Sequence, residues 1–141
     1  MSQLYDHFIS GFRGAVASRE FSERRIGAEL KFPLVNRDGT AAALDELLAL
    51  WHHLAENGWE AIQDPVTGQI AGATSPGPYN DTVASCETGY CKTEFSLAHV
   101  GSLFELSAAI AALRRELTSF SRQRDVQFLG YGIQQIGRAH V

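Results

Sequence analysis

Between residues 26 and 34 the chain alternates strictly between two kinds of side chain, and this run limits the fold more than any other feature. The apolar set is Ile26, Ala28, Leu30, Phe32 and Leu34, and the intervening set is Gly27, Glu29, Lys31 and Pro33. Successive side chains of a strand point to opposite faces of a sheet, so the run predicts a strand with one buried face. The rest of the chain must then supply neighbouring strands and an apolar layer that covers this face.

Apolar residues three and four positions apart predict two helices in the first half of the chain, over residues 3–18 and 41–57. Thr40 is the expected N-cap of the second helix, and Gly58 is expected to end it. The adjacent histidines 52–53 are expected on its surface, because neighbouring helical residues point about 100° apart. The stripe that we expect to face the core consists of Leu44, Leu47, Leu48, Trp51 and Leu54.

A third helix is predicted over residues 102–124, where Ser102 followed by Glu105 has the spacing of a capping box. Its expected inner stripe consists of Leu103, Leu106, Ile110, Leu113, Leu117 and Phe120. Large aromatic side chains are most simply core residues, and we expect this of Trp51, Trp59, Phe104, Phe120 and Phe128.

Runs of β-prone residues bounded by turn residues predict five further strands, over residues 60–63, 69–73, 81–86, 91–97 and 126–134. The first two are separated by a short turn and should form a hairpin. The predicted order is therefore helix, strand, helix, four strands, helix and strand. This order indicates an α+β fold, with a mostly antiparallel sheet and helices on one face.

Composition narrows the class of function. The 141 residues carry 12 basic against 16 acidic side chains, which does not suit a surface that tracks nucleic-acid phosphates. No apolar run approaches the roughly 18 to 20 residues that span a bilayer, and the N-terminus lacks a secretory pattern. Cys86 and Cys91 are expected as buried reduced thiols, with a disulfide between paired strands as the alternative. We expect a cytoplasmic protein that binds neither nucleic acid nor membrane.

Three glutamates are the main candidates for chemistry. Glu29 and Glu94 lie in the middle of predicted strands, and Glu87 lies at the turn before the second of them. Carboxylates gathered on one sheet face repel one another unless a divalent cation neutralises them, and oxygen ligands suit Mg²⁺ or Mn²⁺. The alternative is that these carboxylates are only solvated charges. Lys31, Lys92 and Ser96 are expected on the same outer face, where they need water, a ligand or a metal.

Three segments resemble the glutamate-cysteine ligases. IGAELKF (26–32) resembles the opening strand of that family, which has a glutamate in an IGxE setting. CETGYCKTEFSLAHVGSLFEL (86–106) resembles a later segment, in which one glutamate precedes a second in a strand that a helix follows. FLGYGIQ (128–134) resembles the strand after that helix. The order and intervals fit over residues 22–134, about the first third of such an enzyme.

The resemblance implies a glutamine-synthetase-like fold, in which the concave face of an antiparallel sheet is the active site. The implied reaction joins the γ-carboxylate of L-glutamate to the amine of L-cysteine through an acyl phosphate, with ATP and Mg²⁺ (or Mn²⁺). It also implies that Glu29, Glu87 and Glu94 bind the metal. Another carboxylate-amine ligase, or a complete small α+β binding domain without catalysis, is the alternative.

One position departs from the family. Lys31 stands where family members commonly have a second glutamate. A cation there would repel a metal but could bind a phosphate or a substrate carboxylate, so Lys31, Lys92 and Ser96 are the substrate-binding candidates. The equally simple alternative is that Lys31 pairs with Glu94 across the sheet.

The last six residues, IGRAHV (136–141), show no pattern of their own. One codon spelling of them, ATC GGA AGA GCA CAC GTC, resembles a widely used sequencing adapter, which continues with a stop codon. We therefore expect residues 136–141 to be a non-native tail. The resemblance then implies that residues 1–135 are the N-terminal part of a ligase catalytic domain, inactive alone. A natural C-terminus is the alternative.

Overall fold

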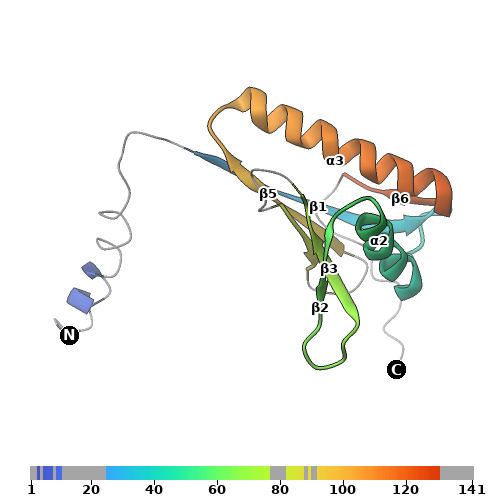
Figure 1. Cartoon of the computed structure of the whole chain (residues 1–141), viewed down its shortest axis with the longest axis horizontal. Coiled ribbons are helices and arrows are strands. Elements are labelled where there is room, and N and C mark those ends of the chain that lie inside the picture. The colour runs from blue at the N-terminus through green and yellow to red at the C-terminus, as the bar shows by residue number, and fades with distance from the viewer. Residues whose placement is uncertain are drawn as a thin grey trace.

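The computed structural model describes residues 25–76, 82–87, 89 and 92–130, together with residues 3, 5–7, 9 and 10. In this part of the chain six strands form one antiparallel sheet, in the order β2-β3-β4-β5-β1-β6 (Figure 1). The strands are β1 (Ile26–Asn36), β2 (Glu60–Gln63), β3 (Ile70–Thr74), β4 (Val83–Cys86), β5 (Lys92–Val100) and β6 (Val126–Phe128). The expected α+β fold is confirmed.

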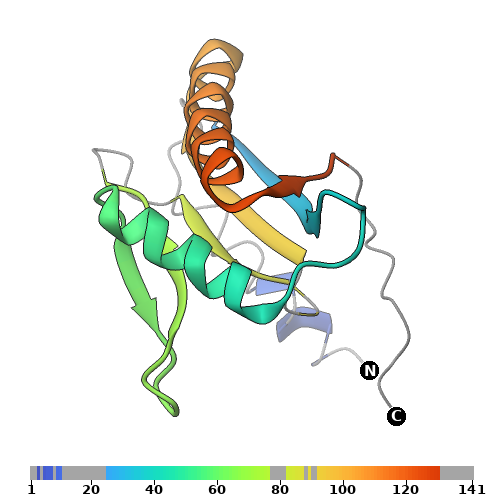
Figure 2. The same ribbon diagram turned by 90° about the vertical axis from the view of Figure 1, so that its right-hand side faces the viewer.

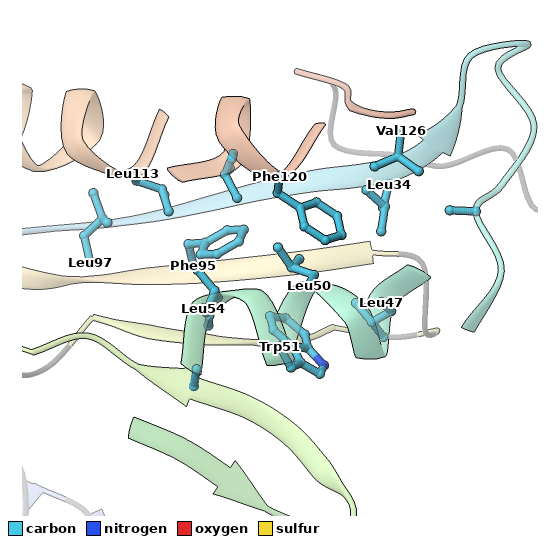
Figure 3. Close-up of a cluster of buried hydrophobic side chains, with 14 residues drawn as sticks. Leu34, Leu47, Leu50, Trp51, Leu54, Phe95, Leu97, Leu113, Phe120 and Val126 are labelled. Carbon is cyan, nitrogen blue, oxygen red and sulfur yellow. The ribbon is translucent and has the colours of Figure 1, made fainter. Parts of the chain in front are cut away.

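Helices α2 (Leu44–Glu56) and α3 (Leu103–Arg124) pack against the sheet, α2 mainly over β2 and β3 and α3 over β1, β5 and β6 (Figures 1 and 2). Side chains from both helices meet those of β1 and β5 in a single cluster (Figure 3). Its largest fully buried members are Trp51, Phe95, Phe120, Leu34, Leu47, Leu50 and Leu54. No helix in the described part of the chain is long and apolar enough to cross a membrane.

The register of β1 and β5 confirms a strand with one buried face over most of its length, but Pro33, which was expected on the opposite face, is also fully buried. Glu29 pairs with Ser96, and Lys31 pairs with Glu94. Because paired residues share a face, these four side chains point away from the core, whereas Leu30 and its partner Phe95 point toward the helices. The sheet therefore has a helix-covered face and a second face, which we call the open face.

The start of α2 differs from the prediction. Thr40 does not cap the helix, because its hydroxyl and its N–H both donate to Asp38 Oδ1, at 2.6 and 3.0 Å. Ala41 instead forms an isolated bridge with Val35, and the helix begins only at Leu44, after Ala43. Leu44 is 50% exposed, so its place in the inner stripe was wrong. Asn57 and Gly58, at φ +90°, end the helix as expected.

The start of α3 confirms the expected cap but not the expected burial. Ser102 Oγ accepts a hydrogen bond from the N–H of Glu105 at 3.2 Å, and Glu105 Oε2 accepts one from Gly101 at 2.8 Å. Leu103 and Phe104, which were expected in the core, are 69% and 89% exposed. The buried side chains of α3 are Leu113, Leu117 and Phe120, so the core lies under its second half.

Other predictions need smaller corrections. His53 is buried, and its ring lies 5.4 Å from that of Phe120. Cys86 is exposed rather than buried, and Cys91 lies outside the described residues. Strand β6 ends at Phe128, and the rest of its expected span beyond residue 130 also lies outside them, as do the expected tail 136–141 and most of the expected first helix.

Candidate functional site: the open face of the sheet

The candidate site is built from the adjacent strands β1 and β5 and from the residue that follows β4. Alternation brings Glu29 and Lys31 of β1 to the open face, and the same rule brings Lys92, Glu94 and Ser96 of β5 there. Glu87 directly follows β4, and its N–H donates to the carbonyl of Lys92 at 2.9 Å, which holds it beside β5. All six predicted site residues therefore gather in one region.

Lys31 lies at the centre of this region. Its Nζ donates to Glu87 Oε1 and to Glu94 Oε2, both at 2.7 Å. Glu29 Oε2 lies farther from the same nitrogen, at 3.5 Å. The expected alternative, a pair between Lys31 and Glu94 across the sheet, is confirmed. One ammonium group thus joins three carboxylates from three segments of the chain.

The remaining oxygens of two of these carboxylates are also engaged. Lys92 Nζ lies 2.6 Å from Glu87 Oε2, which is buried, and Ser96 Oγ donates to Glu94 Oε1 at 3.2 Å. Glu87 and Glu94 are therefore held on both sides. Glu29 is different, because its side chain is 60% exposed and its contact with Lys31 is longer, at 3.5 Å.

Ion pairing fixes the charge states of the cluster. The hydrogen bonds to Glu87 and Glu94 raise the pKa of Lys31 well above its ordinary value, and they outweigh the opposite effect of partial burial. The hydrogen bonds from Lys31 and then Lys92 lower the pKa of Glu87. Three carboxylates against two ammonium groups give the cluster a formal net charge of −1.

The predicted metal ligands, as they lie, do not fit a divalent cation. The ammonium of Lys31 takes the point at which Glu29, Glu87 and Glu94 meet, so a second cation there would be repelled. In the part of the chain that the structure describes, no three His, Cys, Asp or Glu side chains are arranged to hold a metal ion. The metal role of these glutamates stays a prediction that requires Lys31 to move away.

His99, which sequence reasoning left out of the candidate site, also belongs to the open face. At the end of the β1–β5 pair an open cleft of about 560 Å³ is lined by Gly27, Ala28, Glu29, Ser96, Leu97 and His99. The available signal was a break in alternation, because Phe95 and Leu97 are followed by polar His99 and then by apolar Val100. We call this cavity the His99 cleft.

Comparison with known proteins does not extend this picture. No protein-family model matches the chain, and no curated protein matches it either. The resemblance to the glutamate-cysteine ligases therefore stays a prediction, carried by the three segments of the sequence.

Proposed function

We propose that this chain is the N-terminal part of the catalytic domain of a cytoplasmic, ATP-dependent carboxylate-amine ligase of the glutamate-cysteine ligase kind. One observation carries the proposal. The helices cover one face of the sheet, and the opposite face gathers Lys31, Lys92, Glu87 and Glu94 within hydrogen-bonding or ion-pairing distance. An open sheet face with convergent charges is the arrangement that the resemblance implies for the active site.

The proposed reaction proceeds in two steps. An oxygen of the γ-carboxylate of L-glutamate attacks the γ-phosphorus of ATP, and ADP leaves with the electron pair of the broken P–O bond. The neutral amine of L-cysteine then attacks the acyl carbon, the C–O bond breaks, phosphate leaves with its electron pair, and the new amide nitrogen loses a proton to solvent. Such chemistry needs positioning and charge neutralisation more than covalent catalysis by the protein.

Lys31 is placed to supply that positive charge. An ammonium has three N–H donors, and here two are held at 2.7 Å by Glu87 and Glu94. Among the described residues, the third carboxylate near this nitrogen is that of the exposed Glu29, at the longer distance of 3.5 Å. A phosphate or a substrate carboxylate could replace Glu29 there without breaking either short hydrogen bond. No step is assigned to Mg²⁺, since the glutamates as they lie do not fit it.

A second candidate is a binding domain without catalysis. The observation that favours it is the pairing of Glu87 and Glu94 with Lys31, Lys92 and Ser96, because side chains that pair with one another do not need a ligand. In that case the lysines hold β1, β5 and the β4–β5 connection together. The two candidates differ in one measurable result: the ligase releases ADP at a rate that falls when Lys31 is replaced, whereas the binding domain releases no ADP that depends on the amino acids.

The test is ADP release by the product of the uninterrupted reading frame, with ATP, Mg²⁺, L-glutamate and L-cysteine. We expect release that needs both amino acids, and we expect Lys31→Met to reduce it at least about tenfold, since one charged hydrogen bond to substrate is worth that much. Glu60→Gln is the matched control, because Glu60 is an exposed carboxylate in β2 of the same sheet. ADP release that does not depend on L-glutamate or L-cysteine would reject the ligase and favour the binding domain.

A further inference from the structure

A β-bulge places His99 on the open face. From Ile26 to Ala28 the strand β1 advances two residues, while its partner β5 advances three, from Val100 to Leu97. Two residues of β5, Ala98 and His99, therefore oppose one residue of β1. The bulge is held by Thr82, whose Oγ1 accepts a hydrogen bond from the N–H of Ala98 at 3.1 Å. Bulges of this kind redirect a side chain, and they are common beside binding sites.

The ring of His99 lies directly over Gly27. A Cβ added to Gly27 would come within 3.0 Å of His99 Cδ2 and 3.3 Å of His99 Nε2. Because residue 27 has the same parity as Glu29 and Lys31, that Cβ would point to the open face. The ring is therefore on this face, and the glycine provides the space it occupies.

Three hydrogen-bond acceptors border the His99 cleft. Glu29 is exposed and only weakly held by Lys31. Ser96 lies directly opposite Glu29, and its hydroxyl keeps its lone pairs because it donates its proton to Glu94. A neutral His99 adds one ring nitrogen that accepts. Among the residues that line the cleft, Glu29 is the one with a full charge, and that charge is negative.

We propose that the His99 cleft binds a primary ammonium group. A primary ammonium carries one positive charge and three N–H donors, which match the carboxylate of Glu29, the hydroxyl of Ser96 and the imidazole of His99. The inference rests on the proposed ligase function, in which the ammonium belongs to the amine substrate. The cleft adjoins Lys31 through Glu29, so the amine would lie beside the place proposed for the anionic substrate.

The test is a titration of the ¹⁵N-labelled chain with n-propylammonium chloride, without ATP, followed by amide resonances. We expect saturable shifts at Gly27, Glu29, Ser96 and His99. Tetramethylammonium has the same charge but no N–H donors, and we expect it to bind at least about tenfold more weakly. Equal binding of the two cations, or no saturable shift in the cleft, would overturn the proposal.

Variants assign the contacts. We expect Glu29→Gln and His99→Phe each to weaken binding of n-propylammonium about tenfold or more. The matched controls are Glu60→Gln and His52→Phe, which alter the same residue types at exposed positions outside the cleft. Ser96→Ala provides a further, smaller change if His99→Phe fails to fold. Unchanged affinity in folded Glu29→Gln and Ser96→Ala variants would also overturn the proposal.

The outcomes separate this inference from the ligase proposal. Binding of n-propylammonium in the cleft without any amine-dependent ADP release would keep the site and reject the ligase. Amine-dependent ADP release by the full reading-frame product, with an amine KM unchanged by Glu29→Gln and Ser96→Ala, would keep the ligase and reject the site.

Discussion

The two faces of the sheet satisfy their side chains by different means. On the helix-covered face Phe95, Ala84 and Ala73 are completely buried, and their neighbours are apolar side chains of α2 and α3. On the open face Lys31 and Glu87 remain about 30% exposed and are held by short, charged hydrogen bonds. Burial of apolar surface is non-directional, whereas these bonds fix the positions of individual atoms. The first face therefore supplies most of the stability, and the second supplies the geometry of the candidate site.

The largest expected effect comes from removing a core side chain. Phe95→Ala should lower the free energy of unfolding by about 3–5 kcal/mol, because it leaves a cavity between the sheet and both helices. Urea denaturation followed by circular dichroism measures it. Phe104→Ala is the matched control, since Phe104 is 89% exposed, and it should change stability by less than about 0.5 kcal/mol. Similar losses in both variants would contradict the placement of the core.

A side chain added at Gly72 should disrupt the pairing of β3 with β4. A Cβ there would lie 2.3 Å from the carbonyl oxygen of Ala84, so the backbone must move. We expect Gly72→Ala to cost about 1–3 kcal/mol and to speed amide exchange in both strands. Gly130→Ala is the control, because its Cβ would meet no atom within 4 Å. If amide exchange stays slow in Gly72→Ala, β3 and β4 lie farther apart at this position than the 2.3 Å approach implies.

Removing the central cation tests the open face. Lys31→Met leaves Glu29, Glu87 and Glu94 close together without the ammonium, so the variant should be less stable than the wild type at neutral pH. The deficit should shrink in acid, where protonation relieves the repulsion. Thermal unfolding of both proteins across the pH range measures it. A deficit that does not vary with pH would mean that Lys31 contributes through packing alone.

Replacing Glu87 should have a smaller effect on stability, and this effect should disappear at acid pH. Its pKa is lowered in the folded protein from an ordinary value near 4.5 by the hydrogen bonds from Lys31 and Lys92. The stability it contributes is therefore complete above about pH 4.5 and is lost as the pH falls through the lower, folded pKa. Glu87→Gln should consequently be less stable than the wild type above that pH and should approach it below. A constant difference between the two unfolding curves would contradict the ion pairs.

The smallest expected effect is at an exposed ion pair that supports the helix-covered face. Arg124 near the end of α3 donates to both oxygens of Glu46 at the start of α2, at 2.9 and 3.0 Å. Arg124→Gln should reduce stability only slightly in low salt, because water screens such pairs. The difference should disappear in 1 M salt. A loss that persists at high salt would indicate that packing of the arginine side chain matters more.

Much of the fold followed from periodicity, and most errors arose where local hydrogen bonds decided the outcome. Alternation from Ile26 to Leu34 predicted β1 and its two faces. Thr40 donates two hydrogen bonds to the side chain of Asp38 instead of capping the helix, and α2 begins later than the pattern predicted. Helical spacing also put Leu103 in the core, although spacing cannot say where along its length a helix meets the sheet.

In the candidate site, too, periodicity predicted which face the side chains share but not which of them are in contact. Alternation predicted that Glu29, Lys31, Glu94 and Ser96 would share the outer face. Which of these side chains touch depends on the strand register, and periodicity does not give the register. The sequence alone therefore could not decide between a metal site on the glutamates and an ion pair between Lys31 and Glu94. The bulge that redirects His99 is held by a hydrogen bond to Thr82, which immediately precedes β4. Such a long-range contact leaves only a local irregularity in the sequence.

The measurement that tests the central claim most directly follows oxygen from the carboxylate to the phosphate. The product of the uninterrupted reading frame is incubated with ATP, Mg²⁺, L-cysteine and L-glutamate that carries ¹⁸O in its γ-carboxylate. A ligase that forms an acyl phosphate transfers one ¹⁸O atom to each phosphate released, and mass spectrometry of the phosphate detects it. We predict this transfer, with its rate reduced in Lys31→Met. Phosphate released without ¹⁸O, or no phosphate that depends on glutamate, would contradict the account.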